Sequence, residues 1–478
     1  MAQEQEVKCA TTADYPEWLA GYLSNPHRPK ARNADEVVYL PITVHSVGKS
    51  DGSGHYPLLR IFESICRLNE DFAPYKIQFY LKDDINIINR DLYYDHDNFG
   101  DGARMMRTFK KPLTINTYIT NSAPNNACGY WHQSEDAIVV IKNCMGGGGH
   151  TWTHEVGHWL SLPHTFFGWE NKTYDPDEAT PKYHSINGKD TSFVEDALGH
   201  NCRKAGDRFC DTPADYLSLG WSCNSTFKSV QVQKDPLGID FRSDGSNFMS
   251  YSIDACQSKF SEEQNEAMLD YISFAKSFMV NSAIPTGPVS SDPMTFVSPE
   301  NNQQVHYQSI KLEWDHHPNA THYLVNISKF SFFVTLDYEF VVEGNSMNIG
   351  DLPVDKKWYW RVKPFNAYDA CGTFTEAGSF NTYDVTAVDE ISENNHLEIY
   401  PTLVPSNNPT IHVNFDFAEL LPVQVDLFGM EGRLVKKATF DNPGRSLQDI
   451  HLDNLNPGIY LMKISSRKGT LVKRISIQ

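Results

Sequence analysis

The sequence predicts an α+β domain, built on a twisted mixed sheet with a helix that starts where a strand ends, followed by two all-β, sandwich-like domains. In the first part of the chain, apolar runs of strand length alternate with a stretch of helical spacing. The strands are expected at 37–47, 76–81, 113–119 and 137–141, and the helix at 58–72. From about residue 292, short alternating runs are separated by turn residues at intervals of about 8–12, which is typical of β-sandwiches.

Changes in composition divide the chain into four parts. They are an N-terminal extension at 1–33, the α+β domain at 34–283, and β domains at 292–383 and 394–478. The extension is polar and contains several prolines, so we expect it to be exposed and to end in a protease-sensitive linker. A last helix of the α+β domain is expected after Ser261, the N-cap, with Gln264 at the capping-box position.

The 478 residues carry a formal net charge of -19, because 60 Asp and Glu outnumber 41 Lys and Arg. This balance argues against nucleic acid as the main partner, since phosphates would be repelled. No stretch approaches the roughly 20 apolar residues that span a bilayer, so no membrane-spanning segment is expected. The N-terminus lacks the layout of a signal peptide, which taken alone indicates a cytosolic protein. The alternative is a mature chain in which Met1 replaces an export signal.

The nine cysteines favour this alternative. Six of them fall between positions 128 and 256, and the absence of a CxxC pair favours disulfides in an oxidising compartment over a structural zinc site. Cys202, Cys210, Cys223 and Cys256 are expected to form two bridges, with three pairings open, that pin a loop-rich region. The odd total leaves at least one thiol unpaired, and Cys9 is the candidate.

One segment, at 154–164, has the residues of a metal site in its sequence HEVGHWLSLPH. His154 and His158 are four residues apart, so on a helix their imidazoles lie one above the other and can share a metal. Pro163 cannot continue the helix, so the chain is expected to double back and bring His164 to the same ion. Three neutral nitrogen ligands leave the fourth position of a tetrahedral Zn²⁺ open, which is the catalytic arrangement.

Glu155 lies on the same helical turn and is expected to point beside the zinc ion, where it takes a proton from bound water. HExxH alone arises by chance in about 3% of chains of this length, and the third histidine reduces this to about one in a thousand. The alternative is an amphipathic helix with incidental histidines. We interpret His150, one turn earlier, as a helix-start residue, because another ligand would close the open position.

These residues resemble those of the metzincin metallopeptidases, whose pattern is HExxHxxGxxH followed by a Met-turn, and most closely those of the pappalysin family. The resemblance rests on HEVGHWL and on NFMSY at 247–251. It implies that Met249 is a hydrophobic floor under the zinc histidines and that Tyr251 stabilises the tetrahedral intermediate. The family has glycine where this chain has Ser161, and a serine in such a turn costs about 1–2 kcal/mol. Zinc ligation is expected to outweigh this cost.

The same resemblance implies a calcium site. The segment GDRFCDTP at 206–213 is similar to the family's calcium loop, in which Asp207, the carbonyl of Cys210 and Thr212 would bind Ca²⁺. A plain Asx-turn is the alternative.

The resemblance also implies a latent zymogen. The segment VKCAT is similar to the family's N-terminal cysteine segment, although Ala10 stands where glycine is usual. Cys9 would fill the open zinc position until cleavage near Arg28, Lys30 or Arg32 releases it. An unpaired or disulfide-bonded cysteine is the alternative.

The β domains resemble two known modules. Runs at 310–314, 323–327 and 358–362 are spaced like the strands of a fibronectin type III sandwich. The last 85 or so residues resemble the sorting domain of the type IX secretion system, through LEIYP, VDLFG, LNPGIYLMKI and the closing KRISIQ. This resemblance implies passage through the type IX machinery, followed by secretion or attachment to the cell surface.

Together these features predict a secreted zinc endopeptidase. A protein or peptide substrate is expected to lie extended above the zinc helix and to pair with an edge strand at Gly129-Tyr130-Trp131. One alternative is a catalytically degenerate surface adhesin that retains the zinc fold. Another is a zinc amidase that acts on cell-wall peptides.

Overall fold

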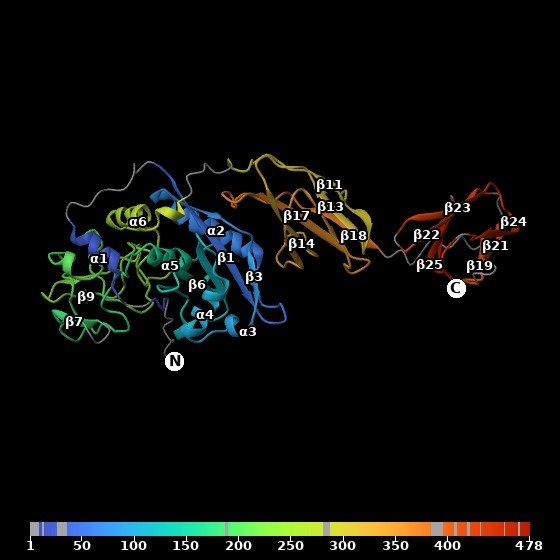
Figure 1. Ribbon diagram of the computed structural model, residues 1–478. Coiled ribbons are helices and arrows are strands. Elements are labelled where there is room, and N and C mark those ends of the chain that lie inside the picture. Colours follow the sequence, from blue (N-terminus) through green and yellow to red (C-terminus); the bar gives the residue numbers. More distant parts are fainter. Residues whose placement is uncertain are drawn as a thin grey trace. The chain divides into compact units, whose positions relative to one another are not determined.

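A six-stranded mixed sheet forms the centre of the first part of the chain, in the order β2-β1-β4-β6-β5, with β3 also paired to β1. Its strands are β1 (Val38–Gly48), β2 (Ile77–Leu81), β3 (Asn86–Asn89), β4 (Ile115–Thr120), β5 (Gly129–His132) and β6 (Ala137–Ile141). β1 is parallel to β2, β3 and β4, and β4 is parallel to β6. β5 is antiparallel to β6 and lies at the edge of the sheet. Figure 1 shows β1, β3 and β6 of this sheet. The predicted mixed sheet is confirmed.

The computed structural model describes residues 9–11, 14–25, 36–186, 190–280, 287–383, 395–405, 409–417, 421–430, 432–453, 455–466 and 469–478. The predicted cleavage region, with Arg28, Lys30 and Arg32, lies outside the described residues. The chain divides into two units. One comprises Met1–Glu300, Leu312–Met347 and Trp358–Ser379, and the other Asn301–Lys311, Asn348–Lys357 and Phe380–Gln478.

Helices cover both faces of the mixed sheet, because its parallel strands are apolar on both sides. The helices are α1 (Glu17–Ser24), α2 (Leu58–Phe72), α3 (Asp91–Tyr94), α4 (Phe99–Phe109), α5 (Thr151–Trp159) and α6 (Glu262–Ala275). On one face α2 and α5 share a core with Ile138 and Val140. On the other, α3 and α4 share a core with Tyr118 and Val139. Alternate residues of one strand thus serve opposite faces.

The last helix of this domain confirms its predicted start. The Ser261 side chain accepts a hydrogen bond from the Gln264 backbone at 3.1 Å, and the Gln264 side chain accepts one from the Ser261 backbone at 2.8 Å. This reciprocal pair is the capping box. The loop-rich region before α6 contains two short pairs of strands, β7 (Tyr183–Ile186) with β8 (Asp190–Phe193), and β9 (Gln233–Lys234) with β10 (Asp240–Phe241).

The N-terminal extension corrects one prediction. We expected an exposed segment, but Leu19 and Tyr22 of α1 are buried. The Tyr22 hydroxyl donates to the Asp270 carboxylate on α6 at 2.8 Å, and the Trp18 ring meets the Tyr271 ring edge-on. Because the segment is short and polar overall, its composition did not reveal that its apolar side chains pack against α6. The described part of the extension is therefore docked on the α+β domain.

After α6 and the short helical turn Ser277–Met279, the described elements are β-strands. They are β11 (Phe296–Ser298), β12 (Gln303–His306), β13 (Ile310–Trp314), β14 (His322–Ser328), β15 (Tyr338–Glu343), β16 (Ser346–Ile349), β17 (Lys357–Phe365) and β18 (Gly378–Tyr383). In the first unit β14 is antiparallel to β15 and to β17, and in the second unit β12 is parallel to β18. The three predicted runs lie in β13, β14 and β17, so their assignment as strands is confirmed.

The final strands form a sandwich. They are β19 (Asn395–Tyr400), β20 (Leu403–Val404), β21 (Thr410–Phe417), β22 (Val423–Gly429), β23 (Leu434–Phe440), β24 (Arg445–His451), β25 (Gly458–Ser466) and β26 (Gly469–Ile477). One sheet has the order β19-β21-β24 and the other β20-β26-β25-β22-β23. Both contribute to one apolar core, which includes Val413 and Phe415 from the first sheet and Leu427 and Ile464 from the second. The predicted sandwich-like architecture is confirmed here.

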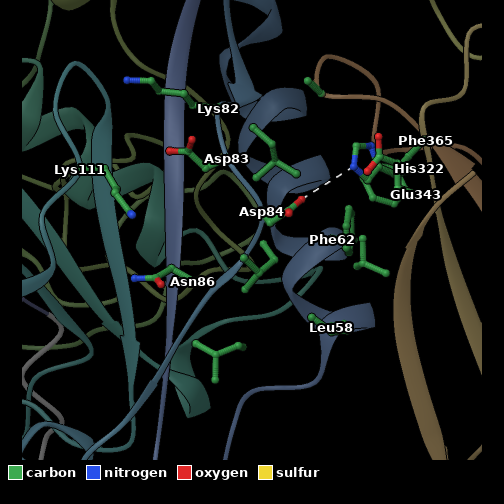
Figure 2. A pocket seen from close by; sticks show the side chains of 15 residues that line it. Leu58, Phe62, Lys82, Asp83, Asp84, Asn86, Lys111, His322, Glu343 and Phe365 are labelled. Carbon is green, nitrogen blue, oxygen red and sulfur yellow. Dashed lines mark ion pairs between the residues drawn. The ribbon is translucent and has the colours of Figure 1, made fainter.

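Within the first unit, β15 and β17 pack on the outer side of α2. The Phe62 and Phe365 rings lie 4.6 Å apart, and the Leu59 backbone N–H donates to the Glu339 carboxylate at 2.7 Å. A cavity of about 860 Å³ lies beside this contact, lined by apolar side chains and by charged groups of both signs (Figure 2). Helix α2 is therefore held between the mixed sheet and the β-strands that follow the α+β domain in the sequence.

Eight of the nine cysteines form disulfides, as expected for a protein of an oxidising compartment. The pairs are Cys66–Cys371, Cys128–Cys144, Cys202–Cys210 and Cys223–Cys256. The last two select one of the three pairings that the sequence left open. Cys9 is free and buried. The first bridge joins residues 305 apart and cross-links α2 to the segment after β17.

Replacing both Cys66 and Cys371 by serine is expected to destabilise the first unit more than replacing both Cys202 and Cys210. A cross-link stabilises mainly by restricting the unfolded chain, and the two sequence separations are 305 and 8. Loop-closure entropy gives about 6 kcal/mol for the first bridge and about 2.5 kcal/mol for the second. Calorimetric unfolding of both double variants measures the difference, and an equal or smaller loss for the Cys66–Cys371 pair would show that chain entropy does not dominate.

Candidate metal centre

Helix α5 is fixed at its start by α2. His150 is the N-cap of α5, and its Nδ1 donates to the Asp71 carboxylate at 2.7 Å. The Thr153 hydroxyl donates to the same carboxylate oxygen at 2.6 Å. His150 is thus a helix-start residue, as predicted. Asp71 was missed by sequence reasoning, because it belongs to another helix and no motif connects it to α5.

The end of α5 reverses the chain through a left-handed residue. Ser161 has a φ of 73°, and its N–H donates to the His158 carbonyl at 2.9 Å. The next N–H, that of Leu162, donates to the Gly157 carbonyl at 3.0 Å. This pair of bonds is the Schellman motif, in which the left-handed position is usually glycine. The turn that we expected after the helix is therefore present, with serine in the strained conformation.

The reversal brings three imidazoles together. The Nε2 atom of His158 lies 3.1 Å from the Nε2 atom of His154 and 3.1 Å from that of His164. Nδ1 of His154 donates to the Phe248 carbonyl at 2.7 Å, and Nδ1 of His158 donates to the Leu162 carbonyl at 2.8 Å. These two rings therefore have their protons on Nδ1 and their lone pairs on the converging Nε2 atoms. All three histidines are buried.

The cluster fits a zinc ion. Lone pairs that converge in a buried site are favourable only with a cation between them. A tetrahedral zinc with Zn–N bonds of about 2.0–2.1 Å separates its nitrogens by about 3.3–3.4 Å, close to the separations found here. The Cys9 sulfur completes the group, since one ligand atom from each of the four residues lies within 4.8 Å of the others. Burial lowers the pKa of His158 and His164, which keeps both rings neutral, as metal ligands must be.

Met249 packs on the zinc-site helix α5, and Tyr251 lies against the histidine cluster. A Cβ added to Gly157 would come 2.4 Å from the Met249 sulfur, so the methionine packs directly on the backbone of α5. The Asn247 side chain accepts from the Met249 N–H at 2.8 Å and shapes the turn. The Tyr251 ring lies 5.0 Å from the His164 ring, and burial raises the pKa of its hydroxyl. Tyr251 thus adjoins the histidines, whereas Met249 packs on the helix that carries two of them, and the roles assigned to both residues stay predictions.

The N-terminal segment covers the cluster. Cys9 forms a parallel bridge with Gly129 of β5, and the Ala10 N–H donates to the Gly129 carbonyl at 2.9 Å. The Tyr251 hydroxyl donates to the Cys9 carbonyl at 2.7 Å. This segment therefore lies on the edge strand that we expected a substrate to use.

Glu155 is buried beside the cluster, under the same segment. Its Oε2 accepts from the Thr11 hydroxyl at 3.1 Å, and the Thr11 oxygen accepts from the Trp131 N–H at 2.8 Å. Burial raises the pKa of Glu155 to about 8, although hydrogen bonds from Cys9 and Thr11 act in the opposite direction. Thr11 was missed by sequence reasoning, because its contact with Glu155 depends on pairing with β5 and leaves no pattern in the sequence.

Among the residues predicted for calcium, Asp207 and Thr212 are hydrogen-bonded to each other. Asp207 Oδ1 accepts from the Thr212 hydroxyl at 2.8 Å and from the Phe209 N–H at 3.0 Å. This is the Asx-turn that we weighed against calcium. The Cys210 N–H donates to the Glu263 carboxylate at 2.8 Å. The three residues are not members of the histidine cluster, and the calcium ion stays a prediction.

The chain is similar to extracellular metalloproteases of fungi. The protein of that name from Neurospora crassa is 27% identical over 258 residues, which cover 49% of this chain and 73% of the relative. One from Colletotrichum graminicola is 26% identical over 261 residues, which cover 50% of this chain and 77% of the relative. Among solved structures, the FN1-FN3 domains of chicken CNTN1 match 40% of this chain and 69% of that one, with 14% identity and a TM-score of 0.21. The metalloprotease relatives imply a bound metal.

The C-terminal part matches the model of the secretion system C-terminal sorting domain over residues 398–478. This match confirms the predicted sorting domain. Together with the extracellular relatives, it also confirms the predicted secretion or attachment to the cell surface. Within the part of the chain that the structure describes, no helix combines the length and the apolar character needed to cross a bilayer.

Replacing Ser161 by glycine is expected to stabilise the protein by about 1 kcal/mol, because glycine adopts the left-handed conformation without the Cβ penalty. Alanine at the same position is the matched control, since it retains the Cβ and removes only the hydroxyl. Thermal unfolding of the three proteins measures the effect. A glycine variant no more stable than the alanine variant would mean that the turn stores no such strain.

Proposed function

We propose that the chain is a secreted zinc endopeptidase of the pappalysin type of metzincin, held latent by its own N-terminal segment. The observation that carries this proposal is that three consecutive residues, Cys9 to Thr11, contact every group that peptide hydrolysis would use. Those groups are the metal-binding histidines, the Glu155 carboxyl, the Tyr251 hydroxyl and the edge strand β5. Similarity to extracellular metalloproteases supports the same activity.

Zinc would be held by His154, His158 and His164, with Cys9 as the fourth ligand of the latent form. When bound, zinc supplies Lewis acidity, which polarises a peptide carbonyl and lowers the pKa of water. The backbone carbonyls that accept from Nδ1 of His154 and His158 hold these rings in the tautomer that presents Nε2. Burial raises the pKa of the Cys9 thiol, so its binding as a thiolate depends on the ion.

Glu155 would transfer a proton from the attacking water to the leaving amine. When residues 9–11 leave, its Oε2 loses the Thr11 hydroxyl and becomes accessible to water beside the histidines. The carboxylate then takes a proton from the water that attacks the scissile carbonyl. It gives this proton to the leaving amine as the C–N bond breaks, so it acts first as general base and then as general acid.

Tyr251 would stabilise the charge that develops on the substrate oxygen. In the latent form its hydroxyl already donates to a peptide carbonyl, that of Cys9, at 2.7 Å. A substrate carbonyl placed near the metal would accept the same hydrogen bond. The bond strengthens as the oxygen becomes negative in the transition state, which is how such a donor accelerates the reaction.

A protein substrate would pair with β5. The Ala10 N–H donates to the Gly129 carbonyl, and Cys9 lies in register with this strand. An extended substrate segment would use the same backbone groups, since exposed sheet edges bind peptides by adding a strand. The N-terminal segment and the substrate would therefore compete for the same backbone groups of β5. The sorting domain would make the type IX secretion machinery the partner that delivers the enzyme outside the cell.

Glu155→Gln is expected to abolish cleavage without loss of metal. The amide keeps the shape of the side chain but cannot take up the proton, so cleavage should fall by about 10²–10⁴-fold. Casein cleavage after limited proteolysis, together with zinc content by mass spectrometry, measures both effects. Glu178→Gln, at an exposed carboxylate, is the control. Equal cleavage would exclude Glu155 as the base, and loss of zinc along with cleavage would make its role structural.

Cys9→Ala is expected to make the full-length chain active before any cleavage of the N-terminal segment, because the fourth zinc position becomes accessible to water. Casein cleavage at least about tenfold above the intact wild type is predicted. The double variant Cys9→Ala/Glu155→Gln should be inactive, which excludes a contaminating protease. A Cys9→Ala chain as inactive as the wild type until proteolysis would refute latency through the thiol.

A further inference from the structure

One histidine of the cluster is oriented by a different kind of group from the other two. His154 and His158 donate to backbone carbonyls at 2.7 and 2.8 Å. The Nδ1 atom of His164 lies 3.6 Å from the Oε1 atom of Glu170. Only 4% of the His164 side chain and 11% of the Glu170 side chain are exposed. His164 therefore has a buried carboxylate behind its ring, where its two partners have neutral carbonyls.

Glu170 is placed by its own stretch of chain. Its second oxygen, Oε2, accepts from the Gly168 N–H at 2.7 Å, in a turn where Gly168 has a φ of 95°. The His164 ring stacks on the Phe166 ring, with centroids 4.5 Å apart and planes 12° apart. Glu170 Oε1 makes no hydrogen bond to the described residues. One oxygen is thus anchored on the backbone, and the other faces the imidazole.

We propose that Glu170 is a positioning residue for His164 as a metal ligand. The inference rests on the proposed function, because it takes zinc as the bound ion. A histidine that binds a metal through Nε2 has its proton on Nδ1, so the N–H of His164 would be directed at Glu170 Oε1. A carboxylate in this position holds the ring in place and makes the imidazole a stronger donor to the ion. The bond would be charge-assisted, unlike those of the other two histidines.

The Glu170 carboxylate is expected to lower the stability of the metal-free protein. A buried carboxylate oxygen without a hydrogen bond destabilises a fold, because it has lost its hydration. Neutralising Glu170 should therefore leave the metal-free protein equally or more stable and at the same time weaken its hold on zinc. A residue that merely supports the fold would change both quantities in the same direction.

A competing role follows from the position of Glu170. It also lines a small cavity of about 20 Å³ beside the cluster, together with Trp131 and Phe167. A carboxylate there could contact a basic side chain of the substrate instead of serving His164. That role predicts a changed cleavage preference with unchanged zinc affinity.

The test compares Glu170→Gln and Glu170→Ala with the wild type, as full-length chains. Zinc affinity is measured by competition with a chelator of known affinity, and stability by thermal unfolding of the metal-free proteins. We expect the alanine variant to bind zinc about 10–100-fold more weakly than the wild type. The glutamine variant should also bind zinc more weakly than the wild type. The unfolding temperature of the metal-free glutamine variant should be equal to that of the wild type or higher. Glu178→Gln controls for the removal of a negative charge.

Three results would overturn the inference. Zinc affinity within twofold of the wild type in both variants would show that Glu170 does not act on His164, and a shifted cleavage preference would then assign it to the substrate. Weaker zinc binding with an equally lowered stability of the metal-free glutamine variant would make its role structural. If the wild type itself binds no zinc, the proposed function fails first, so the two failures are distinguishable.

Discussion

The convergence of three imidazoles in a buried space is the constraint on which the rest of the site depends. Two Nε2 to Nε2 distances of 3.1 Å bring lone pairs together, and backbone carbonyls prevent two of the rings from turning them away. Such an arrangement is stable only around a cation. The left-handed turn at Ser161 supplies the third ring, and Met249 supports the helix that supplies the other two. Backbone strain and close packing thus both serve the metal position.

In the proposed latent form, residues 9–11 would act through their position more than through their size. Cys9 lies in the histidine cluster and its carbonyl accepts from the Tyr251 hydroxyl, while Thr11 donates to the Glu155 carboxylate. Contacts farther along, such as the Tyr22 hydroxyl with Asp270, anchor the segment through α1. A segment of the same chain has a high effective concentration at the site. It can therefore inhibit the site through the Cys9 sulfur and the backbone pairing with β5 together. Removal of the covalent tether would be sufficient to lose this advantage.

Helical spacing alone placed His154 and His158 on one face, and Pro163, which cannot continue a helix, predicted the return of His164. The mixed sheet, the capping box of α6 and the terminal sandwich were predictable for the same reason, since local periodicity and turn chemistry determine them. The pairing of the cysteines was not, because it depends on which loops meet in space. The docking of Leu19 and Tyr22 was missed because it depends on the surface of α6. The sequence pattern did not predict the contacts of Asp71, Thr11 and Glu170 with the site. These contacts depend on how separate segments meet in the fold, which local spacing does not determine.

X-ray absorption at the zinc edge tests the central claim most directly, because it reports the atoms bound to the metal. The full-length chain should show three nitrogen scatterers and one sulfur, the latter at about 2.3 Å. After limited proteolysis removes the N-terminal segment, the sulfur should disappear and a light atom should take its place, with the three nitrogens retained. A zinc shell without sulfur in the intact chain, or one with fewer than three imidazoles in either form, would contradict the account.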